Sequence, residues 1–309
     1  MIPIERVAIV GLGLMGGSLA RALAERDVRV LGYDSAPDSL DAAEGEGIVH
    51  ERLGAQLMGI EAADVVVFAL PVDATLAVLP RVAPRLGKTR LVMDVASTKR
   101  SIVAAAEAVG LGARYVGAHP LTGSHRSGWR ASRASLFDEA RVFLCPTSTT
   151  DAATLQLAET FWRGLRAGVE VLDAATHDEQ MAWRSHLPHV LSTALALTLR
   201  DAGIQQSALG PGGRDMTRLA GGPPTLWTSI VEDNEVALAG ALDAIEQQIR
   251  VLRQSLQNHD SGTTHDFFAD GRDWFDGAPI EPVCRPERSG RSEQFVVLSA
   301  AADRNSLSS

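Results

Sequence analysis

A glycine-rich turn close to the N-terminus constrains the fold of this chain more than any other feature. The apolar run Arg6–Val10 leads into the pattern GLGLMG at residues 11–16, and residues 16–24 then have helical spacing, with Leu19 and Leu23 on one face. A strand that passes through glycines into a helix is how a βαβ unit begins. We therefore expect the chain to open with an α/β domain.

The same turn has the features of a dinucleotide-binding site. Gly11 permits the tight turn, Gly13 lets the backbone approach a pyrophosphate, and Gly16 allows close packing of the helix on the strand. Leu14 and Met15 open the helix, whose N–H groups and dipole attract phosphate. The alternative is a tight turn without a ligand. The strand, the helix and a following acidic residue together favour the cofactor site.

That acidic residue is Asp34, which ends the second predicted strand 18 positions after Gly16. Its carboxylate can accept hydrogen bonds from the 2′-hydroxyl of an adenosine ribose, and it would repel a 2′-phosphate. No arginine follows within the next several residues, so we expect NAD rather than NADP. Pro71 ends the predicted strand Asp64–Pro71, at the edge where an open α/β sheet builds its ligand crevice, and we expect it to contact the cofactor as well.

Strands and helices alternate through the first half of the chain. Asp64–Pro71 is nearly continuous in apolar residues, as expected for a central parallel strand covered on both faces. We therefore expect a Rossmann-like, doubly wound and largely parallel sheet, forming an NAD-binding domain over residues 1–174. The other predicted strands span 28–33, 90–95, 114–118, 141–145 and 170–172, and the other predicted helices span 99–109 and 151–164.

The second half of the sequence has helical periodicity. Residues 177–202 form a helical pattern that Pro188 should kink, and a glycine- and proline-rich loop follows at 210–224. Residues 225–257 have apolar side chains spaced for one long buried stripe. The pattern predicts a smaller all-helical domain over residues 175–258.

Beyond this domain the sequence turns polar. We expect residues 259–309 to form an irregular, partly disordered tail, which a few aromatic side chains could attach to the body: Phe267, Phe268, Trp274 and Phe275.

Composition excludes several classes of partner. The net charge of −9 and the lack of a basic run argue against nucleic acid and anionic membranes, and charges interrupt every apolar stretch before it could span a bilayer. Two cysteines are too few for a disulfide framework, and a strand pattern begins almost at the first residue. We expect a soluble, cytoplasmic protein without a signal peptide.

Two residues at strand ends are candidates for chemistry. His119 follows a predicted strand, and a histidine can accept a hydroxyl proton during hydride transfer. The plainer alternative is a histidine bonded to nearby backbone, but the carboxyl end of a parallel strand favours catalysis. Ser97 follows the end of the predicted strand 90–95, where it could contact substrate or nicotinamide, cap the next helix, or do both.

The helical half offers candidates for binding. Ser185 and His189 lie four residues apart, on one helical face. His186 and His189, without a cysteine partner, are a weak metal signal, and we expect no metal. The segment GGRDMTR offers two arginines, Arg214 and Arg218, which could bind a substrate carboxylate; the alternative is the start of a helix with a solvated salt bridge.

Taken together, these segments resemble the prephenate/arogenate dehydrogenase family. The resemblance rests on VAIVGLGLMGGSLARAL, DVASTK, GAHPLTGSHRSG, HDEQMAWRSHLPH and GGRDMTRLAGGPPTLW, in the family's order over about residues 4–234. The first motif occurs in many dehydrogenases, whereas the later ones are much more specific. The family's reaction is an NAD-dependent oxidative decarboxylation that makes the substrate ring aromatic.

The resemblance also implies roles for individual residues. His119 would accept a hydrogen bond from the ring hydroxyl, with Ser97 as its catalytic partner, and Arg218 would bind a substrate carboxylate. The other positions that match the family's substrate pocket are Ser124, Ser185, His189 and Trp227. Family members are typically homodimers through the helical domain. His125 stands where relatives often carry an acidic residue, which favours prephenate over arogenate.

Two other interpretations compete with this one. The β-hydroxyacid dehydrogenases share the GLGLMG opening but need a lysine in the helical domain, and this chain has only Lys88 and Lys99. A non-catalytic dinucleotide sensor would keep the fold, yet it leaves the combination of His119, Ser97 and Arg218 unexplained.

Overall fold

The computed structural model describes residues 4–123 and 127–277. By its internal contacts the chain divides into one unit over residues 1–247 and a second from residue 248 onward, and each is described by itself. The predicted domain boundary at residue 174 falls within the first unit and stays a prediction. No described helix is long and apolar enough to cross a membrane.

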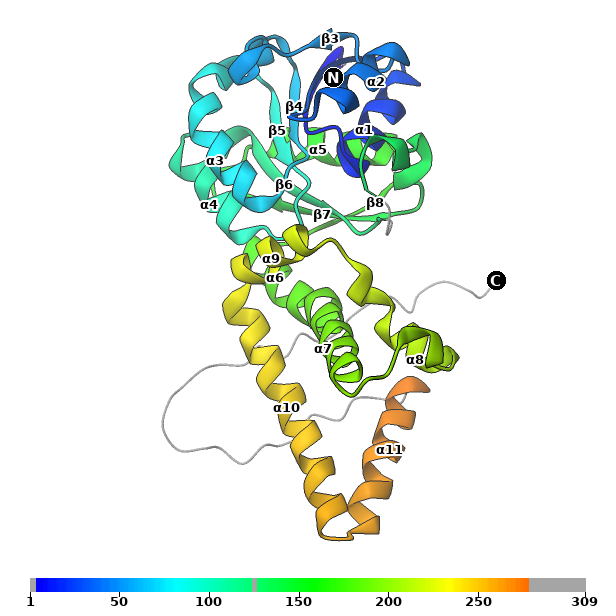
Figure 1. Cartoon of the computed structure of the whole chain (residues 1–309). Coiled ribbons are helices and arrows are strands. Elements are labelled where there is room, and N and C mark those ends of the chain that lie inside the picture. The colour runs from blue at the N-terminus through cyan, green and yellow to red at the C-terminus, as the bar shows by residue number, and fades with distance from the viewer. Residues whose placement is uncertain (1–3, 124–126, 278–309) are drawn as a thin grey trace, which may run out of the picture. The chain divides into compact units, whose positions relative to one another are not determined.

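An eight-stranded sheet forms the N-terminal part of the first unit, in the order β3-β2-β1-β4-β5-β6-β7-β8 (Figure 1). The strands from β1 to β6 are parallel, β7 runs antiparallel to β6, and β8 is parallel to β7. The predicted Rossmann-like fold is confirmed. The strand bounds are Arg6–Val10, Arg29–Tyr33, Glu51–Arg52, Val65–Phe68, Leu91–Asp94, Tyr115–Pro120, Arg141–Pro146 and Gly168–Val171 for β1 to β8.

Helices cover both faces of this sheet because its inner strands are apolar on both faces. Val7 and Ile9 of β1 pack into a core with α1 and α5, whereas the alternate residues Ala8 and Val10 pack into a second core with α3 and α4. The helices are α1 (Leu14–Ala24), α2 (Pro37–Gly45), α3 (Val72–Val82), α4 (Arg100–Ala108) and α5 (Ala152–Gly164).

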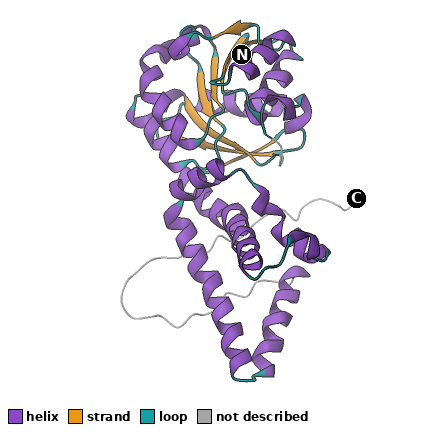
Figure 2. Cartoon of the chain, in the orientation of Figure 1, coloured by secondary structure: helices purple, strands orange, loops and turns teal. Residues whose placement is uncertain are grey.

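The rest of the described chain is helical (Figure 2). The expected kink at Pro188 takes the form of a π-helical turn, η7 (Ala182–His186), placed just before the proline. The glycine- and proline-rich segment is not a loop, because it forms α8 and the short helix η9. The elements are α6 (Ala174–Met181), α7 (Leu187–Asp201), α8 (Pro211–Thr217), η9 (Arg218–Gly221), α9 (Pro224–Asp233) and α10 (Glu235–Gln257).

The predicted single helix over residues 225–257 is wrong in two respects. It divides at Asn234, whose side chain donates to the backbone carbonyl of Asp178 at 2.7 Å. Its apolar stripe is buried only in the first half: Leu238 is 5% exposed, but Ile249 is 57% exposed. The sequence spacing gives the face of a helix, but it does not say how far along the helix a neighbour covers that face.

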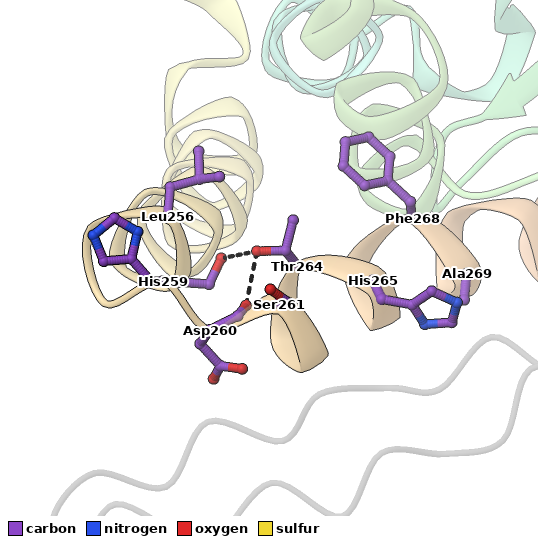
Figure 3. Close-up of a pocket in the computed structure, with 9 residues that line it drawn as sticks. Leu256, His259, Asp260, Ser261, Thr264, His265, Phe268 and Ala269 are labelled. Carbon is purple, nitrogen blue, oxygen red and sulfur yellow. Dashed lines mark hydrogen bonds between the residues drawn. The ribbon is translucent and has the colours of Figure 1, made fainter.

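The expectation of an irregular tail is also wrong for residues 261–275, which form helix α11 (Ser261–Phe275). Asp260 caps this helix: its carboxylate accepts from the Thr263 amide at 3.1 Å, and its carbonyl accepts from Thr264 Oγ1 at 2.9 Å (Figure 3). The aromatic side chains do not attach the segment to a core, since no residue of α11 is buried. Residues 278–309 of the predicted tail lie outside the described residues.

Candidate active site

The glycine turn between β1 and α1 fits a dinucleotide. Gly11 has φ +96°, and a Cβ there would lie 2.4 Å from the carbonyl oxygen of Ala69. A Cβ on Gly16 would lie 1.8 Å from the carbonyl oxygen of Gly11, so these two glycines close the turn. Gly13 has nothing within 4 Å of its Cβ position, which leaves open space beside the first turn of α1 for a pyrophosphate.

Asp34 lies beside this turn, at the end of β2. Its carboxylate accepts from the Leu12 amide at 2.6 Å and from the Ala36 amide at 2.8 Å, which fixes its orientation. Both its position and its charge fit hydrogen bonding to an adenosine ribose. Pro71 follows β4, the strand on the other side of β1; it is exposed and is the N-cap of α3. The turn and Asp34 therefore form a cradle that suits NAD.

A cavity of about 900 Å³ opens at the same edge of the sheet. The sheet contributes Ser97, which follows β5, and His119, which lies near the end of β6. It also contributes Arg141, which no sequence pattern singles out. Because β7 is antiparallel to β6, the first residue of β7 lies beside the last residues of β6. An all-parallel sheet would have placed Arg141 at the opposite edge.

Helical elements line the other side of this cavity. Ser185 comes from η7, His189 from α7, Arg218 from η9 and Trp227 from α9. The rings of His189 and Trp227 stack, with centroids 3.7 Å apart and an angle of 25°. His189 Nδ1 lies 2.9 Å from the Ser185 carbonyl, to which it donates, so its Nε2 is free to accept. Burial lowers the pKa of His189, the hydrogen bond to Ser185 opposes this, and Arg218 lowers it further.

The cavity is rich in positive charge. Arg141, Arg184 and Arg218 line it, and the described lining residues include no aspartate or glutamate. Arg184 donates to Gln180 at 2.7 Å, and Arg141 lies 3.9 Å from Glu170. With the described residues, the side chain of Arg218 makes neither a hydrogen bond nor an ion pair, which leaves its guanidinium available to a ligand carboxylate.

His119 is 8% exposed and is held from behind by α6. Its Nδ1 lies 2.9 Å from His177 Nε2, and His177 Nδ1 lies 2.8 Å from Asp178 Oδ1. Burial lowers the pKa of His119 well below its ordinary value, and the nearby His177, Lys99 and His186 lower it further. His119 is therefore a neutral imidazole at neutral pH, able to accept a hydrogen bond.

A buried ion pair fixes the turn that carries Ser97. Lys99 and Asp94 are both fully buried and paired, Tyr115 donates to Asp94 at 2.5 Å, and the Ala96 amide donates to Asp94 at 2.9 Å. A Cβ on Gly117 would lie 3.0 Å from Lys99 Cδ, so this strand position must be small. The network holds the 95–99 turn against β6, where His119 lies.

The structure thus brings six of the predicted site residues to one cavity: Ser97, His119, Ser185, His189, Arg218 and Trp227. Their roles remain predictions. Ser124 lies outside the described residues. The cofactor candidates Gly11, Gly13, Leu14, Met15, Gly16, Asp34 and Pro71 lie at the ends of β1, β2 and β4, apart from the cavity lining. Arg184 was missed although it stands inside the segment MAWRSH, one residue before Ser185.

A Rossmann sheet with a dinucleotide cradle beside a cavity of neutral histidine and arginines defines a nucleotide-dependent oxidoreductase. Sequence models of two domains match the chain: the prephenate dehydrogenase nucleotide-binding domain over residues 19–171, and the prephenate dehydrogenase dimerization domain over residues 173–270. The chain belongs to the prephenate dehydrogenase family, and its cofactor is NAD.

Individual relatives agree with this assignment. The prephenate dehydrogenase of Bacillus subtilis is 30% identical over 286 residues, which cover 89% of this chain and 76% of that protein. The structure of prephenate dehydrogenase from A. aeolicus, in complex with hydroxyphenyl propionate and NAD+, matches with a TM-score of 0.82 at 28% identity, covering 90% of this chain and 99% of that one. Synechocystis arogenate dehydrogenase matches with a TM-score of 0.76 at 28% identity, covering 88% and 99%.

Proposed function

We propose that this enzyme oxidises prephenate with NAD, to give 4-hydroxyphenylpyruvate, carbon dioxide and NADH. The observation that carries the proposal is the cavity itself: a buried, neutral His119 shares it with three arginines and with no described acidic side chain. A hydroxyl group and two carboxylates are the groups that such a lining can bind at once.

The chemistry divides between hydride removal and loss of the carboxylate. Bound NAD supplies the hydride acceptor. As hydride leaves the hydroxyl-bearing carbon, positive charge develops on that carbon and oxygen. His119 accepts the hydroxyl hydrogen bond and so stabilises this charge. The bond to the ring carboxylate then breaks, carbon dioxide departs, and the electron pair completes the aromatic ring. The hydroxyl proton stays with the phenol product, so no proton is released overall.

The remaining residues bind and orient the substrate in this proposal. Arg218, free of other partners among the described residues, binds one carboxylate, and Arg141 or Arg184 offers a site for the second. Ser97, beside His119, hydrogen-bonds the hydroxyl or the nicotinamide. Trp227 and His189 form a flat wall against the ring, and Ser185 lies at its end.

Charge favours prephenate over arogenate. Prephenate carries two carboxylates, whereas arogenate replaces the keto group by an ammonium group that needs an acidic partner. The described lining offers no such partner, and the three residues that follow Gly123 in the sequence are Ser, His and Arg. An ammonium beside the three lining arginines would bind unfavourably.

The test is absorbance at the reduced-nicotinamide band with purified enzyme, NAD or NADP, and prephenate or arogenate in separate reactions. We expect fast reduction of NAD with prephenate and much slower reduction with arogenate or with NADP. A clear preference for arogenate would overturn the substrate assignment. If neither substrate led to reduction of NAD, in protein shown to bind NAD, the proposed activity would be refuted.

We also propose that the enzyme is a homodimer assembled through its helical segments. The dimerization-domain match extends to residue 270, and α11 exposes large apolar side chains: Phe268 is 65%, Trp274 72% and Phe275 77% exposed. A second copy of the chain is the occupant that would bury them. Light scattering should give a mass in solution twice that of one chain. The double variant Phe268→Ser, Trp274→Ser should have the mass of a single chain. A monomeric wild type would contradict the proposal.

A further inference from the structure

His177 and Asp178 stand behind His119 as the second and third members of a hydrogen-bonded chain. Asp178 is 1% exposed, His177 is fully buried and His119 is 8% exposed, so the chain runs from the interior to the cavity. The two links are short: 2.9 Å between the two imidazoles and 2.8 Å between His177 and the carboxylate. The two rings cross at 70°, which rules out stacking and suits an in-plane hydrogen bond.

Asp178 is anchored on several sides, so its direction is fixed. Oδ1 accepts from the Lys99 amide at 2.8 Å, and Oδ2 accepts from the Arg100 amide at 2.9 Å. These amides belong to the start of α4, whose dipole stabilises the negative charge. The side-chain amide of Asn234 donates to the Asp178 backbone carbonyl at 2.7 Å. Burial opposes ionisation of Asp178, but hydrogen bonds from His177 and these amides hold its pKa below the ordinary value.

The order of donors along the chain follows from this anchored anion. A carboxylate only accepts, so His177 must carry its hydrogen on Nδ1. Burial lowers the pKa of His177, so the ring is neutral and its Nε2 carries a lone pair. That nitrogen can only accept, and His119 must therefore donate from its own Nδ1. In a neutral His119 the lone pair is left on Nε2, which bonds to no described residue and belongs to a ring that lines the cavity.

We propose that His177, fixed by Asp178, is a positioning residue that sets the tautomer of His119, so that Nε2 presents a lone pair to the substrate hydroxyl. The opposite tautomer would present an N–H donor, which cannot accept the hydroxyl hydrogen bond. The inference rests on the proposed function for its kinetic consequence, but the tautomer is a property of the enzyme alone. The pair acts through His119 and does not touch the substrate.

A matched pair of variants isolates the acceptor at position 177. His177→Gln keeps an oxygen that can accept from His119 Nδ1, whereas His177→Met fills nearly the same volume and offers no comparable acceptor. We expect kcat to fall roughly tenfold or more in His177→Met and only a few-fold in His177→Gln, with KM and NAD affinity nearly unchanged in both. His265→Met is the control, because His265 precedes an aspartate as His177 does but is 79% exposed on α11.

A direct readout is the nitrogen NMR spectrum of imidazole-labelled enzyme. In the wild type we expect His119 and His177 to carry hydrogen on Nδ1 and a lone pair on Nε2, and we expect His119 to lose this preference in His177→Met. A wild-type His119 with hydrogen on Nε2 would overturn the inference, as would equal kcat losses in the Gln and Met variants. If His177→Met does not fold, the wild-type spectrum and the Gln variant still decide. An enzyme inactive on every substrate would refute the proposed function while leaving the spectrum to test the tautomer.

Discussion

The two sides of the cavity differ in how firmly they are held. On the sheet side, His119 is bonded to His177, and Ser97 sits on a turn fixed by the buried Asp94–Lys99 pair. On the helical side, Arg218 is exposed on a short helix and makes no hydrogen bond or ion pair with the described residues. The sheet side can hold an acceptor within a narrow range of positions, which chemistry requires. The helical side can adjust to a ligand, which suits recognition.

This contrast predicts that substitutions on the two sides will affect different kinetic constants. Loss of a sheet-side group should lower kcat, because its interaction strengthens as charge develops in the transition state. Loss of a helical-side group should raise KM, because its interaction with a carboxylate is already made in the bound substrate.

The largest effect is expected for His119→Asn. It removes Nε2, the acceptor for the ring hydroxyl, because the shorter Asn side chain ends near the position of Nδ1, and kcat should fall by roughly two or more orders of magnitude. KM and NAD affinity should stay nearly unchanged, because the glycine turn lies elsewhere. Steady-state kinetics and a fluorescence titration with NAD measure these quantities. If His119→Asn mainly raised KM instead, the proposed difference between the sheet side and the helical side of the cavity would be wrong.

The next largest effect is expected for Arg218→Ala. Losing a charged hydrogen bond to a carboxylate costs about 1.5–3 kcal/mol, which corresponds to a KM roughly 10- to 150-fold higher, with a smaller change in kcat. Arg214→Ala is the matched control, because Arg214 is exposed on the neighbouring α8 and does not line the cavity. An unchanged KM in Arg218→Ala, or an equal change in Arg214→Ala, would refute the assigned role.

A smaller effect is expected for Trp227→Leu, which removes the aromatic stack with His189 but keeps an apolar side chain. In the proposed complex this ring also lies against the substrate ring, and an aromatic contact of that kind contributes about 0.5–1.5 kcal/mol, so KM should rise about 2- to 12-fold. Leu226→Ala is a useful comparison, since Leu226 also lines the cavity but carries no aromatic ring. If Trp227→Leu lowered kcat more than it raised KM, the Trp227 ring would act in the chemical step, as the sheet-side groups do, and not in substrate binding.

The sequence predicted the sheet side better than the helical side. Ser97 and His119 follow from local pattern, because apolar runs mark strands and parallel strands end at one edge. Arg141 does not, because the antiparallel direction of β7 depends on tertiary packing that no local pattern records. His177 stands in a quoted motif, but its role needs a partner 58 residues away. Ser185, His189 and Arg218 were binding candidates from their chemistry and spacing, but only the resemblance places them, with Trp227, in one pocket, since periodicity predicts helices without saying which faces meet.

For the same reason, sequence spacing could not predict which apolar side chains are exposed. The spacing of Leu238 and Ile249 puts both on one helical stripe, but whether a neighbour covers them depends on the rest of the fold. The helix α11 was missed because its composition is polar, although Asp260 and Thr263 form a recognisable cap.

The smallest effect is expected from pH, and it separates a buried His119 from an exposed one. An ordinary histidine would be half protonated near pH 6.5, and kcat/KM would be halved there. The pKa of His119 is lowered, so the neutral acceptor persists as pH falls through 6.5, and kcat/KM should be nearly flat from pH 8 to 6.5. The groups that face His119 (His177 on α6, Lys99 before α4, and His186 on η7) all lower its pKa.

Folding must be followed over the same range. Burial lowers the pKa of His186 to about 4, so the unfolded chain binds the proton more readily than the folded enzyme. The contribution of the neutral His186 to the free energy of unfolding is therefore fully present above pH 6.5. It is lost as pH falls from 6.5 towards about 4. Rates should be read only where the melting temperature is unchanged. Half-loss of kcat/KM at pH 6.5 in fully folded enzyme would mean that His119 is solvated like a surface histidine, and the proposed rigidity of the sheet side would fail with it.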